Sequence, residues 1–365
     1  MASYRTRLER DLDGWIGQGL VPAENRAAIL EQVGEARRLD AATALGIVGG
    51  VLAGVAVIAL VAANWSDIPR IARFATILAA FLGVAGGGAW ASARGRPIVS
   101  QVCLVVAALV FAAAIGLTGQ IFDIAGDPQA ALRGAGLAAA LLAVAGGSPW
   151  AAALALVFVG LGETAGFRLF DGGGPPWPWW MTLSAAAGAA LALRWRSQPL
   201  AHAAGVATSV AVVELFIRIV ATFEKGLGPM LAVAVAAVGL TAGGRWARER
   251  FAPAAGALYG WWAWAALGSV GAAVSELSRM SGLAPGMQGV PTSMAMLAVS
   301  GAVVALGRVD RHGGVTAVGV LGLLGSGASL LMSLGVGLMT SAAVFAGAAL
   351  LALAGALALR GRTRA

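Results

Sequence analysis

The sequence predicts an all-α, polytopic transmembrane helical bundle of about twelve spans, preceded by a short cytosolic helical hairpin. Hydrophobic residues make up 59% of the 365 residues and charged residues only 12%, whereas soluble domains carry roughly 25% charged residues. Apolar runs follow one another from residue 42 to residue 359, and most approach the roughly 20 helical residues that a bilayer crossing needs. Lipid is therefore the expected solvent for most of this surface.

Residues 1–40 differ from everything after them because they carry six Arg and seven acidic residues. Leu8, Leu12 and Trp15 recur at helical spacing, and Pro22 suits the first turn of a second helix. The segment is expected to form a cytosolic helical hairpin. We do not expect a cleavable signal peptide, because the segment has no early apolar stretch.

Residues 41–365 form the predicted transmembrane bundle. The expected spans lie near residues 42–63, 71–91, 98–118, 130–147, 150–167, 178–194, 200–221, 228–243, 253–274, 291–307, 314–333 and 339–359. Short loops connect them, most of which carry Arg.

The positions of the basic residues predict the orientation of the bundle. If the N-terminus is cytoplasmic, eighteen of the 25 basic residues fall on the inner side, as the positive-inside rule requires. Both termini are then cytoplasmic. The net charge of +8 does not indicate nucleic acid as a partner, because the Arg residues flank the apolar runs and form no stripe that would follow phosphates.

The sequence gives little support for a metal site or for thiol chemistry. Cys103 is the only cysteine, which excludes an intrachain disulfide and a thiolate metal site. His202 and His312 fall in different segments, and no HExxH or GxxxxGK[ST] motif occurs. We therefore expect no metal and no cofactor. His202 begins a span, so we interpret it as an interfacial residue in preference to a proton relay.

Glycine is abundant, with 53 residues. In the first predicted span Gly46, Gly50 and Gly54 lie on one helix face, which permits close backbone approach. General tight packing and a contact between two copies of the chain, as in a homo-oligomer, both remain open.

Ionisable residues inside the predicted spans are the strongest candidates for a site, because each costs a few kcal/mol in lipid. Glu214 and Arg218 stand four residues apart on one helix face and are able to pair. With Glu163 they form the base of a predicted polar cavity open to the periplasm, and Gln120 and Asp123 form its rim. In this cavity a carboxylate exchanges protons and Arg218 holds an anionic group. The alternative is that Glu214 and Arg218 only neutralise one another and lock helices.

Three segments carry a resemblance to a known family. They read Gly17-Gln18-Gly19-Leu20-Val21-Pro22-Ala23-Glu24, Ala62-Ala63-Asn64-Trp65-Ser66-Asp67-Ile68-Pro69-Arg70 and Gly119-Gln120-Ile121-Phe122-Asp123-Ile124-Ala125-Gly126-Asp127. Over about residues 10 to 145 the chain resembles the DUF2157 family of predicted bacterial membrane proteins, whose function is unknown.

The resemblance implies a bacterial inner-membrane protein, with Asn64, Trp65, Asp67 and Pro69 as a family-motif loop. It also implies an envelope partner of the GDYXXLXY type, a motif that this chain lacks. The same loop is explained without function as a tight turn, since Asn closes a helix, Trp suits the headgroup level, Asp caps and Pro starts a helix.

Three functions remain open. A secondary transporter or lipid-linked exporter is favoured by many spans and polar groups within the bundle. The alternative is a non-catalytic scaffold or sensor that works with an envelope partner. An integral-membrane transferase using Asp67 or Asp123 ranks last, because the outer loops are short, and we therefore do not expect an enzyme.

Overall fold

A computed structural model describes residues 4–32, 68–123, 125–166, 179–222, 226–282 and 288–336, and residues 340 and 347 singly. The chain divides into two compact units, Met1–Arg73 and Phe74–Ala365. Twelve helices and no strands are found in the described ranges. The all-helical membrane fold predicted from the sequence is confirmed.

The N-terminal unit contains a helical hairpin of α1 (Tyr4–Gly17) and α2 (Asn25–Gln32). Leu12 and Leu30 are buried, and Arg26 Nε donates a 2.9 Å hydrogen bond to Asp13 Oδ1. α2 begins three residues after Pro22, because the Pro22 carbonyl first accepts the amide of Asn25 in a turn.

Ten further helices correspond one to one to ten of the predicted spans. They are α4 (Arg70–Ala93), α5 (Pro97–Phe122), α6 (Pro128–Gly146), α7 (Pro149–Gly166), α8 (Trp179–Trp195), α9 (Gln198–Thr222), α10 (Leu227–Ala247), α11 (Ala254–Met280), α12 (Gly289–Val309) and α13 (Gly313–Ser333). The predicted spans 42–63 and 339–359 lie outside the described residues.

Seven of the described helices are long and apolar enough to cross a membrane, namely α4, α5, α6, α9, α10, α12 and α13. α7 contains a shorter apolar helix, Pro149–Thr164, and α8 has only 17 residues. α11 has 27 residues, but it packs against α8, α9, α10, α12 and α13 and buries many of its side chains.

The segment between α5 and α6 is a helix stop followed by a helix start. Asp123 ends α5 in the left-handed conformation with φ of 56°, and its amide donates to the Gly119 carbonyl. Asp127 then caps α6, since its carboxylate accepts from the amides of Gln129 and Ala130 at 3.0 and 3.3 Å. Local capping thus accounts for the acidic residues of the 119–127 motif.

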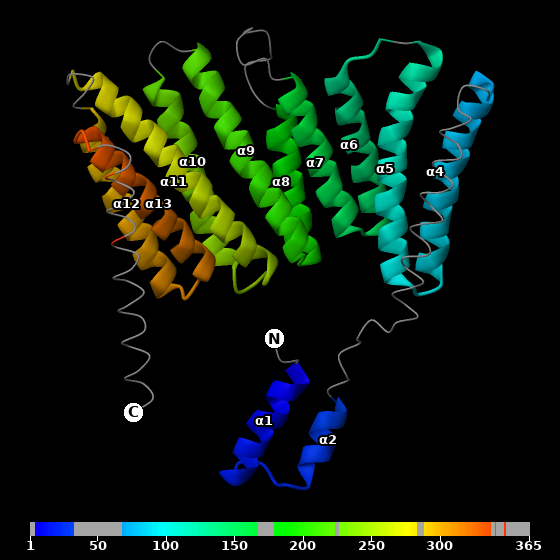
Figure 1. Ribbon diagram of the computed structural model, residues 1–365, viewed down its shortest axis with the longest axis horizontal. Coiled ribbons are helices and arrows are strands. Elements are labelled where there is room, and N and C mark those ends of the chain that lie inside the picture. Colours follow the sequence, from blue (N-terminus) through cyan, green and yellow to red (C-terminus); the bar gives the residue numbers. More distant parts are fainter. Residues whose placement is uncertain are drawn as a thin grey trace. The chain divides into compact units, whose positions relative to one another are not determined.

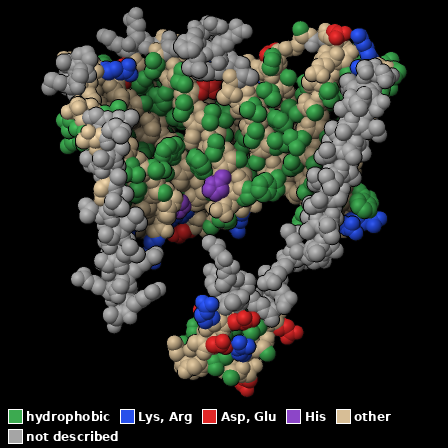
Figure 2. Space-filling model, in the orientation of Figure 1, with side chains coloured by type: hydrophobic (Ala, Val, Ile, Leu, Met, Phe, Trp, Pro, Cys, Tyr) green, Lys and Arg blue, Asp and Glu red, His purple; other side chains and the backbone are tan. Residues whose placement is uncertain are grey.

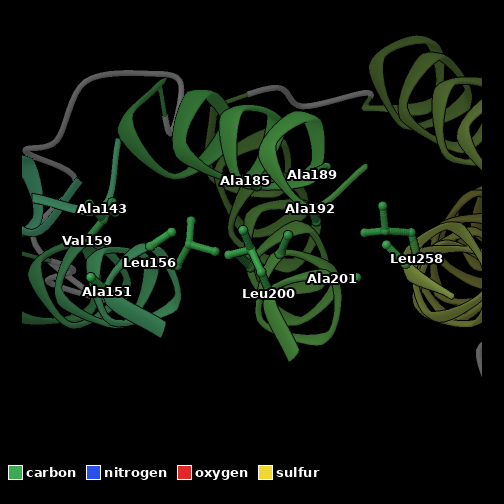
Figure 3. Packing of buried hydrophobic residues seen from close by; sticks show 14 of the residues in the cluster. Ala143, Ala151, Leu156, Val159, Ala185, Ala189, Ala192, Leu200, Ala201 and Leu258 are labelled. Atoms are coloured by element: carbon green, nitrogen blue, oxygen red, sulfur yellow. The ribbon is translucent and has the colours of Figure 1, made fainter. Parts of the chain in front are cut away.

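The helices of the second unit pack mainly as antiparallel neighbours (Figure 1). The pairs α6–α7, α8–α9, α10–α11 and α12–α13 make the most extensive contacts, while α9 joins α7 to α11 and α11 joins the rest to α12 and α13. The largest core cluster draws on α5, α6, α7, α8, α9 and α11 and consists mostly of alanine (Figure 3). Small side chains let these backbones approach closely.

Glycine brings α12 and α13 into the closest contact. A methyl group added at Gly307 would lie 2.5 Å from the backbone nitrogen of Thr316. One added at Gly319 would lie 2.6 Å from the backbone nitrogen of Val304. Because backbone atoms cannot move aside without shifting a helix, these positions need glycine.

We therefore expect Gly307→Ala to lower the free energy of unfolding by about 2 kcal/mol through overpacking. Gly301→Ala on the same helix is the matched control, because a methyl group there meets nothing within 4 Å. Thermal unfolding in detergent measures both variants. Equal melting temperatures for the two variants would contradict this account of the α12–α13 contact.

Candidate functional site

The two ends of the helices in the second unit differ in charge. The turns α4–α5, α6–α7, α8–α9, α10–α11 and α12–α13 lie at one end, which we call the arginine-rich end (Figure 1). Among the residues that the structure describes, its acids are Glu249 and Asp310, and its arginines are Arg94, Arg96, Arg194, Arg196, Arg245, Arg248, Arg250, Arg308 and Arg311. The opposite end, the carboxylate-rich end, has the described acids Asp123, Asp127, Glu163, Glu214 and Glu276.

Glu163 of α7 forms an ion pair with Arg133 of α6. The guanidinium donates from Nε and Nη2 to Glu163 Oε1 at 2.8 and 2.6 Å, and the Glu163 side chain is only 3% exposed. Arg133 also lies over the ring of Trp180, 5.4 Å from its centroid. The pair therefore connects α6, α7 and the start of α8.

Gly162 allows the two helices of this pair to meet. A methyl group at Gly162 would lie 3.3 Å from the Gln129 carbonyl oxygen of α6. Gly162 therefore makes room for the backbone of α6. The short separation places Arg133 within reach of the carboxylate.

Glu214 and Arg218 pair within α9, as their spacing predicted. Arg218 donates from Nε and Nη2 to Glu214 Oε1 at 3.2 and 2.6 Å. Glu214 is buried and Arg218 is largely buried. This pair leaves the carboxylate of Glu214 neutralised inside the helix bundle.

Glu163 and Glu214 line one cavity between α7 and α9. Its volume is about 170 Å³, and its lining residues are Glu163, Thr164, Val210, Val213, Glu214 and Ile217. The surface of the cavity is almost entirely apolar, so the two glutamates line it mainly with their aliphatic parts, while a carboxylate oxygen of each is bonded to its arginine. The cavity brings together two acids that lie far apart in the sequence, each next to its own arginine.

Other predicted site residues lie elsewhere. Gln120 and Asp123 are exposed at the end of α5 and do not line the cavity between α7 and α9. Pro69 is exposed directly before α4. Asn64, Trp65 and Asp67 lie outside the described residues.

A third carboxylate–arginine pair was missed by the sequence reasoning. Glu276 and Arg279 pair within α11 at the carboxylate-rich end. The three-residue spacing was a usable signal, but both residues follow the predicted span 253–274. Three carboxylates at this end are thus paired with arginine.

Asp310 organises the arginine-rich end and was also missed. Arg245 of α10 donates from Nε and Nη2 to its two carboxylate oxygens at 2.7 and 2.9 Å, and the Tyr259 hydroxyl of α11 donates to Oδ2 at 2.7 Å. Arg248 donates to the Asp310 carbonyl at 3.0 Å. The turn between α12 and α13 is thereby tied to α10 and α11.

The surroundings of Asp310 favour its charged form. Its side chain is 2% exposed. The hydrogen bond from Arg245 lowers the pKa of Asp310 below its ordinary value of 3.8, against the opposing effect of burial, and Tyr259 and the charge of Arg248 act in the same direction as Arg245. Asp310 therefore stays ionised at neutral pH.

The ion pairs of Glu163 and Glu214 with arginine determine what this site can do chemically. A proton added to Glu163 or Glu214 would neutralise the acid and weaken its hold on the paired arginine, and an anion would compete with the carboxylate for the same guanidinium. Among the residues that the structure describes, no group of three His, Cys, Asp or Glu is placed to hold a metal ion.

Replacing one member of the Arg133–Glu163 pair should destabilise the fold. We expect Arg133→Gln to cost about 3 kcal/mol, because it leaves a buried carboxylate without its partner. Adding Glu163→Gln should recover much of that loss. A double-mutant cycle by thermal unfolding measures the coupling, and additive effects of the two substitutions would contradict a buried ion pair.

The effect of Asp310→Asn should depend on pH. Because the folded-state pKa of Asp310 lies below 3.8, its charge stabilises the fold above that pH, and the contribution is lost as pH falls through the folded-state value. At neutral pH we expect a loss of about 2 kcal/mol. Melting temperatures of both proteins, measured down to about pH 3, should converge on acidification. A gap that stays constant or widens would refute this role.

Comparison with known proteins identifies the N-terminal part of the chain. No curated protein and no solved structure shows significant similarity to it. The family match ends within α7, so Arg133 lies inside the matched segment while Glu163 and Glu214 lie beyond it. Residues 13–152 match the family model DUF2157, described as a predicted membrane protein, which confirms the resemblance that the sequence motifs indicated.

Proposed function

We propose that this multi-pass membrane protein is a secondary transporter or exporter that moves a small anionic solute together with protons. One observation supports the proposal most strongly. Glu163 and Glu214 line the same cavity, and each is paired with an arginine inside the helix bundle. Ionisable groups are costly in lipid, and helix locking alone does not require two carboxylates to share a cavity.

The proposed cycle uses competition for arginine. A proton from the aqueous side binds the Glu163 carboxylate, which frees the Arg133 guanidinium for the anionic group of the solute. Loss of that proton on the other side restores the Arg133–Glu163 pair and displaces the anion. Glu214 and Arg218 act in the same way, so one proton accompanies each anionic group that a pair binds.

The proposed location is the bacterial inner membrane. The described second unit has nine arginines and two acids at the arginine-rich end, and the positive-inside rule favours the cytoplasm for such an end. The cavity between α7 and α9, nearer the carboxylate-rich end, would then open toward the periplasm.

The test is transport by reconstituted protein. Vesicles that contain a pH-sensitive dye receive inorganic phosphate or succinate outside, and proton uptake is recorded. We expect the anion-dependent proton flux to fall at least tenfold in Glu163→Gln and in Glu214→Gln, because each removes an exchangeable proton.

Glu249→Gln is the matched control, because its side chain is 88% exposed at the opposite end and should leave transport unchanged. All proteins are reconstituted from monodisperse fractions at equal amounts. Fluxes in Glu163→Gln and Glu214→Gln that equal those of the unsubstituted protein would refute the proposal.

A further inference from the structure

A second and larger cavity lies near the arginine-rich end. Its volume is about 720 Å³, within the range of small-molecule sites. The starts of α9 and α13 and the first half of α11 line it, including Gln198, His202, Trp261, Trp264, His312 and Leu321. Both histidines of the chain therefore line one cavity.

Internal contacts fix the hydrogen position on His202. The Trp261 indole Nε1–H donates to His202 Nδ1 at 3.0 Å. A nitrogen that accepts a hydrogen bond carries no proton, so the neutral imidazole has its hydrogen on Nε2. His202 therefore carries an N–H donor on a ring that lines the cavity.

His312 is held in the same way. The Val315 amide donates to His312 Nδ1 at 3.2 Å, so His312 also caps α13, and its ring packs edge-on against Tyr259 with centroids 5.2 Å apart. The proton of the neutral ring is again on Nε2. Within the described part of the chain, neither Nε2 group has an acceptor.

Apart from the exposed Gln198, the remaining lining of the cavity is apolar, and it reaches the lipid-facing surface. Trp264 is 43% exposed, and Leu321 is also exposed. Figure 2 shows histidine on the drawn face of the molecule, among hydrophobic side chains. A ligand can therefore enter sideways from the bilayer, with a polar group at the histidines and an apolar tail against Trp264 and Leu321.

The charge of this end selects the sign of the polar group. Nine arginines and two acids lie at the arginine-rich end in the described residues, and the acid Asp310 is already neutralised by Arg245. Surplus arginine attracts anionic lipid headgroups and disfavours a quaternary ammonium. Two N–H donors suit the oxygens of a phosphate.

We infer that the cavity between α9, α11 and α13 binds an anionic membrane phospholipid. The headgroup phosphate accepts hydrogen bonds from Nε2 of His202 and of His312. One acyl chain lies along Trp264 and Leu321. The inference is independent of the proposed transport function, because it concerns different residues at the opposite end of the bundle.

Quenching by brominated lipid tests this site in the full-length protein. Vesicles of phosphatidylcholine contain a small fraction of acyl-brominated phosphatidylglycerol or, for comparison, acyl-brominated phosphatidylcholine. The signal of Trp264 is the difference between the unsubstituted protein and Trp264→Phe. Trp246→Phe is the matched control. Trp246 lies on α10 near the arginine-rich end, is 74% exposed and does not line the cavity.

We expect phosphatidylglycerol to quench Trp264 with an apparent affinity about tenfold above that of phosphatidylcholine, because a hydrogen bond to a charged group has that effect or more. Trp246 should be quenched alike by both lipids. The double variant His202→Phe, His312→Asn should lose the preference at Trp264. Asn keeps the cap on α13, and unchanged quenching of Trp246 verifies that the variant is folded.

Three outcomes would overturn the inference. They are equal quenching of Trp264 by the two lipids, a preference that persists in the double variant, and a preference that free inorganic phosphate abolishes. The last outcome would identify a site for soluble phosphate and exclude a lipid site.

Discussion

Ionisable side chains inside a low-dielectric bundle must meet a partner, and this constraint orders the carboxylate-rich end of the protein. An unpaired buried carboxylate is strongly destabilising. Glu163 meets Arg133 from the neighbouring helix, whereas Glu214 and Glu276 meet arginines one turn along their own helices. Of these three ion pairs, only Arg133–Glu163 joins two helices.

Small residues make these pairings geometrically available. The main core cluster is built largely of alanine (Figure 3), and Gly162 lies against the backbone of α6 directly beside Glu163. Close helices shorten the distance that a charged group must span, so the same packing that stabilises the bundle also positions Arg133. The glycine contacts of α12 with α13 serve packing alone in the described structure.

The arginine-rich end uses a different arrangement, because water is near. Asp310 receives hydrogen bonds from Arg245 and Tyr259, while most arginines around it are exposed. The Tyr259 ring in turn supports His312. Through this chain of contacts the ion network that ties the α12–α13 turn to α10 and α11 also fixes one wall of the large cavity.

Local patterns in the sequence predicted the parts of the structure that depend on neighbours in the chain. Apolar runs located ten described helices, and four-residue spacing predicted the Glu214–Arg218 pair. Arg133 is 30 residues from Glu163, and only tertiary packing brings them together. Gln120 and Asp123 follow a span, yet they lie exposed at the end of α5.

The contacts of the two histidines also could not be predicted from local sequence patterns. The start of a span explained His202 as interfacial, but its hydrogen bond to Trp261, 59 residues away, required the packing of α9 on α11. His312 drew no interpretation, although its position before a span suits a helix cap. Sequence spacing gives contacts within a helix, whereas contacts between helices depend on which faces meet.

The most direct test of the account is whether water reaches the cavity shared by Glu163 and Glu214. Val210 lines that cavity, whereas Val238 is exposed on α10 at a comparable depth from the carboxylate-rich end. Each is replaced by cysteine. Both are placed in a Cys103→Ser background and treated with a membrane-impermeant thiol reagent. The account predicts that residue 210 reacts and residue 238 does not. Equal reactivity, or an inert residue 210, would contradict it.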